Sequence, residues 1–308
     1  MPVKETIIDP VPKELLKEEL TPSRFLMDTH KAGNRLYIVD GSAPNVLRET
    51  GRLREIAFRG GGGGTGKALD LDRFDLDPDL GYKQLVLWDP DAEAIIGGYR
   101  FVPGTDIRIG RDGQPLMPSA HLFRFSRYYI RHYLPATIEL GRSFVSPEYQ
   151  STGSAPKSLF ALDNLFDGLA ALMGLYGGRM KYFFGKMTIY PTYPEPALNM
   201  ILFFLRKYFG RRQDRLVIPK NKIDITDDVR LEGIFSGKGY REDYRTLKAE
   251  IRKMGVNIPP LVNSYMNMSP TMRCFGAAVN DEFGNVIEAG LMIGFDEIFS
   301  EKLLRHIV

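Results

Sequence analysis

The sequence predicts an α/β fold with a mixed central sheet flanked by helices and a helical insertion. Three observations lead to this prediction. Strand-like and helix-like segments alternate along most of the chain, a strand runs through a glycine-containing loop into a helix at residues 137–159, and residues 219–256 become charge-rich and helical. We expect an N-terminal arm over residues 1–33 and a single domain over residues 34–308, with the insertion at about 219–256.

The individual elements follow from local patterns. Runs of β-branched and aromatic residues predict strands at 35–40, 84–88, 94–102, 137–145 and 181–190, and a closing hairpin about residues 281–285. Apolar spacing and charge patterns predict helices at 12–20, 45–59, about 155–175, 195–209 and 243–254. The strands at 84–88 and 94–102 should form a hairpin, and residues 103–136 read as a long connection.

Composition excludes several classes of protein. With 308 residues, 44% hydrophobic and 26% charged, the chain has the balance of an ordinary globular protein. A net charge of +3 is too small to indicate a nucleic-acid partner. The single cysteine, Cys274, lies in an apolar run and predicts a packing role, and the four histidines show no metal-ligand spacing.

The N-terminus lacks a signal-peptide pattern, and no stretch reaches the roughly 18 apolar residues of a membrane span. We expect a cytoplasmic protein, and peripheral contact with the inner face of the membrane stays open.

The loop after residue 145 has a pattern suited to holding an anion. Gln150, Gly153 and Ala155 fit the form Q/R-x-x-G-x-G/A, with Ser154 inside it and Val145 ending the strand before it. Small residues let the backbone approach a ligand, and free N–H groups at a helix N-terminus favour a phosphate. The loop is therefore a candidate cradle for pyrophosphate or phosphopantetheine, although a motif this short also fits an ordinary strand-to-helix turn.

Further residues share an order along the chain with a known family. The strand Glu139-Leu140-Gly141-Arg142-Ser143 resembles the E-L-G-R-S strand of bacterial GNAT-like N-acyl amino acid synthases. These include ornithine lipid and glycine lipid N-acyltransferases, often labelled hemolysins. The resemblance covers about residues 35–190 and includes Arg54 and Phe58, Asp72 and Asp75, Arg100, and Glu139 with Arg142. A related family, the acyl-homoserine lactone synthases, favours E-L-S-R-F in this strand.

The resemblance implies a GNAT-like acyltransferase. It would move a long-chain fatty acyl group, in some members 3-hydroxylated, from acyl carrier protein or acyl-CoA to the α-amine of an amino acid. Glycine and ornithine are the expected acceptors. The thioester donor is a co-substrate, so no permanently bound cofactor is implied. The alternatives are an acyl-homoserine lactone synthase-like enzyme, which would need S-adenosylmethionine, and a non-enzymatic membrane-active protein of the hemolysin type.

The resemblance also assigns expected roles. Glu139, Arg142 and Ser143 would be catalytic, with an oxyanion donor near residues 143–145. The acceptor's charged groups would meet an ion network, for which the family positions are Arg54, Phe58, Asp72, Asp75 and Arg100. Taken alone, these arginines and aspartates also fit plain surface charges.

The spacing of Glu139 and Arg142 sets a geometric condition. Residues three apart in a regular strand point to opposite faces, so the pair shares a site only if the strand is interrupted, and Gly141 is a residue that often marks a bulge. Glu139 is then either a general base for the acceptor amine or a structural carboxylate paired with an arginine such as Arg100 or Arg142.

Two other segments invite functional interpretations. Residues 60–67, GGGGGTGK, approach a P-loop pattern, but Ala68 stands where Ser or Thr would hold Mg²⁺, so a flexible loop over the acceptor site is favoured. The apolar helix at 195–209 ends in a basic cluster, which fits either a solvated helix end or a surface for acidic acyl carrier protein or anionic lipid. The cluster consists of Arg206, Lys207, Arg211, Arg212 and Arg215.

Overall fold

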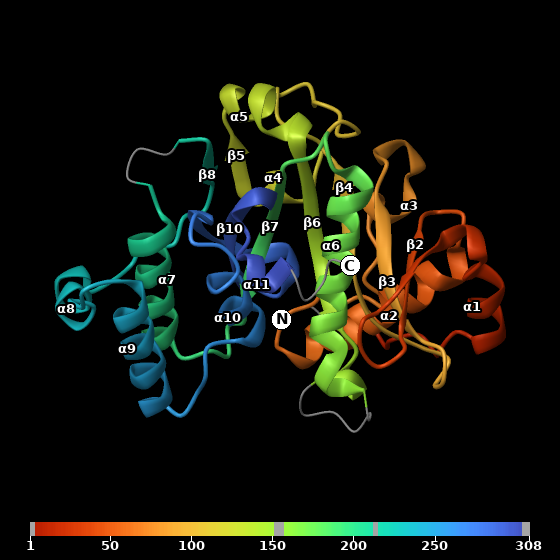
Figure 1. Ribbon diagram of the computed structural model, residues 1–308, viewed down its shortest axis with the longest axis horizontal. Coiled ribbons are helices and arrows are strands. Elements are labelled where there is room, and N and C mark those ends of the chain that lie inside the picture. Colours follow the sequence, from red (N-terminus) through yellow and green to blue (C-terminus); the bar gives the residue numbers. More distant parts are fainter. Residues whose placement is uncertain (1–3, 151–156, 212–214, 304–308) are drawn as a thin grey trace.

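The computed structural model describes residues 4–150, 157–211 and 215–303. Its centre is an eight-stranded sheet with the order β1-β2-β3-β4-β6-β7-β10-β9, flanked by helices (Figure 1). The strands are β1 (Phe25–Asp28), β2 (Arg35–Val39), β3 (Lys83–Asp89), β4 (Ala94–Pro103), β6 (Thr137–Val145), β7 (Tyr182–Ile189), β9 (Arg273–Asn280) and β10 (Val286–Gly294). All neighbouring strands are antiparallel except β6 and β7, so the sheet is mixed, as predicted.

The helices are α1 (Lys13–Glu19), α2 (Pro44–Gly60), α3 (Arg73–Leu76), α4 (Ser119–Leu122), α5 (Arg127–His132), α6 (Ala161–Tyr176), α7 (Glu195–Phe209), α8 (Asp228–Ile234), α9 (Tyr240–Lys253), α10 (Pro260–Met266) and α11 (Ser300–Leu303). The predicted order of long elements is confirmed. The strand β1 was not predicted. It pairs with β2 and so makes part of the expected N-terminal arm an edge of the sheet.

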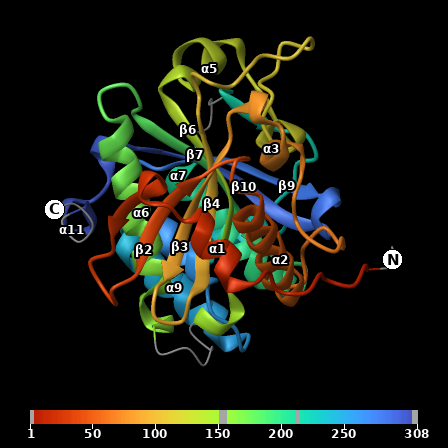
Figure 2. The ribbon, with the colours of Figure 1, turned by 90° about the vertical axis from the view of Figure 1, so that its right-hand side faces the viewer.

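The two faces of the sheet carry different helices, because alternate residues of each strand point to opposite sides. On one face, Leu85 and Tyr99 pack with Leu165 and Leu169 of α6. On the other face, Tyr37, Val86 and Trp88 pack with Val46 and Phe58 of α2. Figure 2 shows α6 and α2 on opposite sides of β3 and β4. Gly168 allows the close approach of α6, since a Cβ at this position would overlap Leu85.

The parallel pair β6–β7 is the weak junction of the sheet. It is paired only through residues 137–139 of β6, opposite residues 182–184 of β7. Beyond Glu139, β6 keeps its antiparallel partner β4, whereas β7 continues along β10 as far as Ile189. Residues 140–145 of β6 therefore have one edge without a strand partner, and the two halves of the sheet part at this point.

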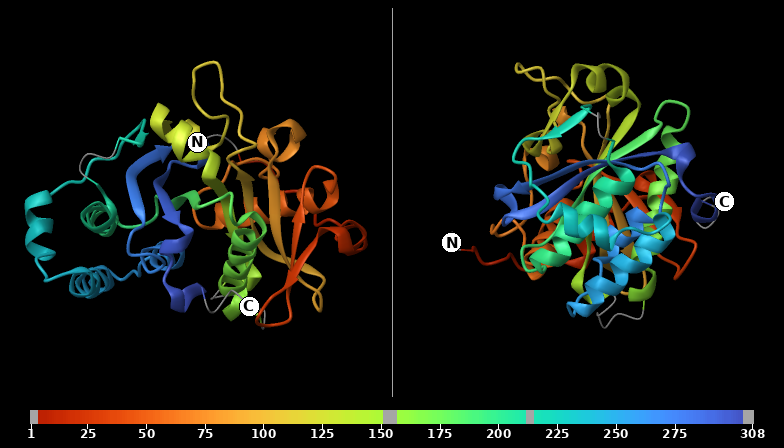
Figure 3. Two further views of the ribbon diagram at one scale, coloured as in Figure 1. Left: turned by 45° about the horizontal axis from the view of Figure 1, so that its top comes forward. Right: turned by 90° about the vertical axis from the view of Figure 1, so that its left-hand side faces the viewer.

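The predicted insertion forms a small helical unit at one end of the molecule, where α8 and α9 lie beside α7 (Figures 1 and 3). It also changes the interpretation of the basic helix end. Arg206 forms an ion pair with Asp228 at 2.9 Å, and Lys207 forms one with Asp243 at 2.6 Å. The carboxylates of the insertion thus neutralise these two members of the basic cluster. Arg212 lies outside the described residues.

The connection at 103–136 is more ordered than predicted, because it contains α4, α5 and β5 (Phe123–Phe125), which pairs with β8 (Val217–Pro219). One segment of the described chain, residues 158–176, is long and apolar enough to cross a membrane by length and composition. The sequence analysis did not detect it. This segment includes α6, whose inner side packs on the sheet.

Candidate active site

A network of buried charges covers the α2 face of the sheet. Arg54 of α2 and Arg100 of β4 are fully buried, and both contact Asp75, with N–O distances of 3.0 and 2.8 Å. Arg100 also pairs with Asp72 at 2.7 Å, and Gln84 bridges Arg54 and Asp75. A buried charge is tolerated when it is paired, so these residues are not the plain surface charges that composition alone allowed.

The spacing of the two aspartates has a local cause. Asp72 is the N-cap of α3 and its side chain accepts a hydrogen bond from the Phe74 N–H, while Asp75 accepts one from the Asp72 N–H at 3.0 Å. This capping box holds both carboxylates toward the arginines. Burial alone would raise the pKa of the Asp75 carboxyl, but the charges of Arg54 and Arg100 outweigh it and hold that pKa well below its usual range.

A bulge in β6 brings Arg142 to the same face. Gly98 opposes Phe144 and Arg100 opposes Gly141, so two residues of β6 oppose one residue of β4. Arg142 has a left-handed backbone with φ of 50°. The interruption that Gly141 predicted is therefore present, with the strained conformation at Arg142 itself.

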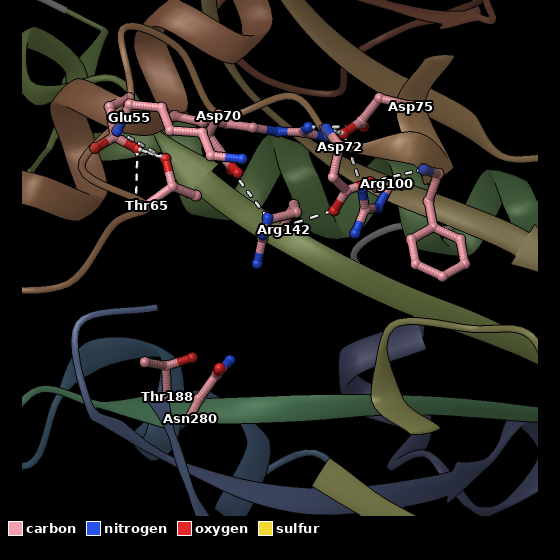
Figure 4. Close-up of polar contacts among 12 residues, drawn as sticks. Glu55, Thr65, Asp70, Asp72, Asp75, Arg100, Arg142, Thr188 and Asn280 are labelled. Carbon is pink, nitrogen blue, oxygen red and sulfur yellow. Dashed lines mark hydrogen bonds and ion pairs between the residues drawn. The ribbon is translucent and has the colours of Figure 1, made fainter. Parts of the chain in front are cut away.

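The Arg142 side chain reaches two aspartates and an aromatic ring. Its Nε lies 2.9 Å from Asp70, and an Nη lies 3.7 Å from Asp72. The guanidinium stacks on Phe283 at 4.4 Å, and Phe283 in turn meets Phe58 edge-to-face. Figure 4 shows Arg142 between Asp70 and Asp72, beside the ion network. Phe58 thus supports the ring beneath Arg142, and its predicted contact with substrate stays a prediction.

Glu139 is buried on this face with partners that the sequence did not indicate. It accepts hydrogen bonds from the Tyr82 hydroxyl at 2.6 Å and from both the backbone N–H and the hydroxyl of Ser119. The alternative in which Glu139 pairs with Arg100 or Arg142 is wrong, because the salt bridges of those arginines go to aspartates. Burial, and then the charge of Glu139, raises the pKa of the Tyr82 hydroxyl well above its usual value.

The predicted donor site is only partly described. Ser143 is half-buried and its hydroxyl lies beside that of Tyr99, whereas Val145 packs toward α6. Gln150 is exposed, and its side chain donates to the Val145 carbonyl at 3.0 Å. The other predicted cradle residues, Gly153, Ser154 and Ala155, lie outside the described residues.

Across the parted strands, β7 and β10 present a second polar group on the same face. Glu288 is buried and contacts Lys186 at 2.8 Å, Asn280 at 3.0 Å and Thr188 at 3.2 Å. Burial by itself raises the pKa of Glu288, but Lys186, and further away Arg142, hold it below its ordinary value. Figure 4 shows Thr188 and Asn280 across from Arg142. Sequence analysis missed this group, although its polar residues alternate with apolar ones along both strands.

The glycine-rich loop is held in place by a carboxylate. Glu55 accepts hydrogen bonds from the N–H and hydroxyl of Thr65 and from the Gly66 N–H, while Arg59 forms an ion pair with it at 2.9 Å. These N–H groups are occupied, so the loop does not form a phosphate cradle. It is also more constrained than the predicted flexible loop.

Within the described residues, no group of three or more His, Cys, Asp and Glu side chains is placed to hold a metal ion.

The mixed sheet is the one expected for a GNAT-like acyltransferase, and comparison with known proteins supports this class. Residues 53–159 match the family model described as acetyltransferase (GNAT) domain. Two relatives are named glycine N(alpha)-acyltransferase. The protein from Bacteroides thetaiotaomicron is 53% identical over 98% of this chain and 90% of its own length, and the protein from Phocaeicola vulgatus is 51% identical over 98% and 93%. The chain belongs to the family of these two proteins, and it is an acyltransferase.

Two solved structures are more distant. The N-acyl amino acid synthase FeeM, from uncultured soil microbes, is 13% identical with a TM-score of 0.33, covering 55% of this chain and 77% of its own. The CoA-dependent acyl-homoserine lactone synthase BjaI is 12% identical with a TM-score of 0.38, covering 89% and 88%. At these scores the likeness carries no inference about this chain.

Replacing Asp75 with asparagine tests whether the ion network stabilises the fold. The change leaves two buried arginines undercompensated, so the free energy of unfolding should fall by about 3–5 kcal/mol. The pKa of Asp75 is lower in the folded than in the unfolded protein. Its contribution to the free energy of unfolding is therefore fully present above the unfolded pKa of about 4, and it is lost as the pH falls below that value. Urea unfolding at pH 7 and at lower pH measures both effects, with exposed Asp106→Asn as the control. Unchanged stability in Asp75→Asn would contradict the assignment.

Proposed function

We propose that this protein transfers a long fatty acyl chain from a carrier thioester to the α-amine of glycine. The observation that carries the proposal is the parting of β6 from β7, which has a polar network on one face of the sheet and an apolar cavity on the other. The names of the two relatives support glycine as the acceptor. In this arrangement the two substrates approach from opposite faces and react at the opening between the strands.

The apolar cavity suits a fatty acyl chain. It has a volume of about 410 Å³, within the range of about 300–1,000 Å³ common for small-molecule sites. Its lining comes from Phe166, Leu169, Ala170 and Met173 of α6, Phe183 of β7 and Met268 after α10. Exposed Leu159 lies on its rim, at the end of α6 that follows the predicted phosphate cradle. A carrier's phosphopantetheine arm that enters past Leu159 would lead its acyl chain into this cavity.

The opening between β6 and β7 offers a backbone donor for the thioester oxygen. The Ser146 N–H donates to Ile96 of β4 at 2.8 Å. Because successive peptide groups alternate sides along a strand, the Val145 N–H points the other way, toward the edge that β7 has left. A fixed N–H at this position would stabilise the negative charge that develops on the carbonyl oxygen during attack.

The polar face suits an amino acid acceptor. Arg142 lies at the rim of the network, with its side chain 15% exposed, whereas Arg54 and Arg100 are enclosed by their partners. A guanidinium there can bind the acceptor carboxylate bidentately. We therefore assign Arg142 to binding the acceptor carboxylate. The role of fixing the position of Arg142 and its surroundings falls to Arg54, Arg100, Asp72 and Asp75. No covalent enzyme intermediate is required, since the amine attacks the thioester directly.

The carrier remains part of the proposal. Acyl carrier protein is supported by the resemblance of the sequence to aminolipid synthases more than by the basic helix end, because the insertion pairs with Arg206 and Lys207. Acyl carrier proteins and acyl-CoA are both cytoplasmic donors of fatty acyl groups, so we place the reaction in the cytoplasm.

The direct test supplies both substrates to the purified protein. Long-chain acyl and 3-hydroxyacyl donors, each as carrier-protein and CoA thioesters, are incubated with glycine, ornithine, alanine or S-adenosylmethionine, and products are identified by mass spectrometry. We expect N-acylglycine as the main product. Formation of an acyl-homoserine lactone, or of no acylated glycine with any donor, would refute the proposal.

Filling the cavity tests where the acyl chain lies. Ala170→Phe places a ring in the space between α6 and β7, so rates with long-chain donors should fall at least tenfold while rates with acetyl or butyryl donors change little. Leu175→Phe, an exposed position on the same helix outside the cavity, is the matched control. An unchanged chain-length profile in Ala170→Phe would place the acyl chain elsewhere.

A further inference from the structure

The buried carboxylates on the α2 face differ in how completely they are hydrogen-bonded. Hydrogen-bond donors reach the side chains of the buried Glu55, Asp75, Glu139 and Glu288, and also that of the half-buried Asp72. Asp70 is also fully buried, yet neither of its carboxylate oxygens has a hydrogen-bond partner among the described residues. It forms an ion pair with Arg142, whose Nε is 2.9 Å away but is not aligned for a hydrogen bond.

The position of Asp70 is set by its backbone. Its N–H donates to the Gly51 carbonyl of α2 at 2.9 Å, and the absence of a side chain at Gly51 lets the chain pass this close, since a Cβ there would lie 2.8 Å from Leu71. The carboxylate is therefore held against the inner side of Arg142, at the edge where β6 has parted from β7. A buried carboxylate that accepts no hydrogen bond costs free energy, even beside a cation, unless some donor reaches it.

We propose that Asp70 binds the ammonium group of the acceptor amino acid and takes the proton that must leave before the nitrogen can attack. This assignment rests on the proposed function and names the base for that reaction. An ammonium supplies the donors that Asp70 lacks, while the substrate carboxylate binds Arg142 beside it. The network balances three arginines, Arg54, Arg100 and Arg142, against Asp70, Asp72 and Asp75, and a zwitterion adds no net charge.

The proton and electron balance is complete without another reactant. One ammonium proton moves to Asp70, which frees the nitrogen lone pair to form the N–C bond. The C–S bond then breaks. The departing sulfur takes the second proton from the nitrogen and leaves as a thiol. Asp70 returns its own proton to solvent after the products leave.

The surroundings of Asp70 favour this exchange. Burial raises the pKa of its carboxyl, and Asp75 acts in the same direction, while Arg142, Arg54 and Arg100 oppose the rise. Across the opening, Lys186 and Glu288 form a pair of opposite charges. A carboxylate with a raised pKa accepts a proton more readily than one with an ordinary pKa. The lone pairs of Glu139, by contrast, already accept hydrogen bonds from Tyr82 and Ser119.

The pH dependence of kcat/KM for glycine, measured with saturating acyl donor, tests the assignment. In the wild-type protein, kcat/KM should reach a plateau once Asp70 is ionised. Asp70→Asn keeps the shape but removes the base, so kcat/KM near pH 7 should fall by about 10²–10⁴. The variant should then depend on free amine in solution, rising about tenfold per pH unit, and the gap to wild type should narrow as pH rises.

Asp243→Asn is the matched control, because Asp243 is a buried carboxylate of the insertion that contacts Lys207 and Tyr208 and has no place in the site. It should lower thermal stability and leave the shape of the pH profile unchanged. A folded Asp70→Asn variant whose profile runs parallel to that of wild type would overturn the proposal.

The wild-type profile alone also decides the matter if Asp70→Asn does not fold. If the wild-type kcat/KM itself rises tenfold per pH unit up to the pKa of free glycine, no enzyme base is acting and the proposal fails. Both of these results leave glycine acylation intact. A wild-type protein that acylates no amino acid would instead refute the proposed function on which the assignment rests.

Discussion

The parting of β6 from β7 is the constraint on which the rest of the site depends. Three residue pairs join these strands, after which β7 follows β10 and β6 stays with β4. The separation leaves peptide groups of β6 without strand partners, at the point where a polar and an apolar face of the sheet meet. The bulge at Arg142 follows the end of this pairing along β6 and turns the Arg142 cation toward the α2 face.

Charge balance explains why so many ionic groups are buried on one face. Arg54 and Arg100 are enclosed by Asp72, Asp75 and Gln84, which leaves them few free donors for a substrate. Their contribution is to fix α2, α3 and β4 relative to one another. Arg54, Arg100 and Arg142 each keep one Nε without a hydrogen-bond partner, whereas both carboxylate oxygens of Asp70 lack one. Asp70 and Arg142 lie at the edge of this network, next to the opening. In our proposal, substrate binding and proton transfer belong to Asp70 and Arg142 at the rim, and the central ion pairs keep the site rigid.

Much of the fold could be predicted because its elements are encoded by local patterns. The predicted strand at 137–145 and helix at 195–209 coincide with β6 and α7, and Gly141 correctly indicated an interrupted strand. The partners of Glu139 could not be predicted, since Tyr82 and Ser119 come from distant segments that only the folded sheet brings together. Asp228 and Asp243, from a separate insertion, likewise pair with Arg206 and Lys207 of the basic helix end. The missing hydrogen bonds of the Asp70 carboxylate result from three-dimensional packing, so no sequence pattern could predict them.

The central claim is that donor and acceptor occupy opposite faces of the sheet and meet between β6 and β7. A crystal structure with glycine and an unreactive thioether analogue of a long-chain acyl donor tests it directly. The account predicts the acyl chain in the cavity beside α6 and the analogue's linkage between the parted strands. It also places the glycine nitrogen within hydrogen-bond distance of Asp70. Glycine bound on the α6 face, or an acyl chain bound among the arginines beneath α2, would contradict it.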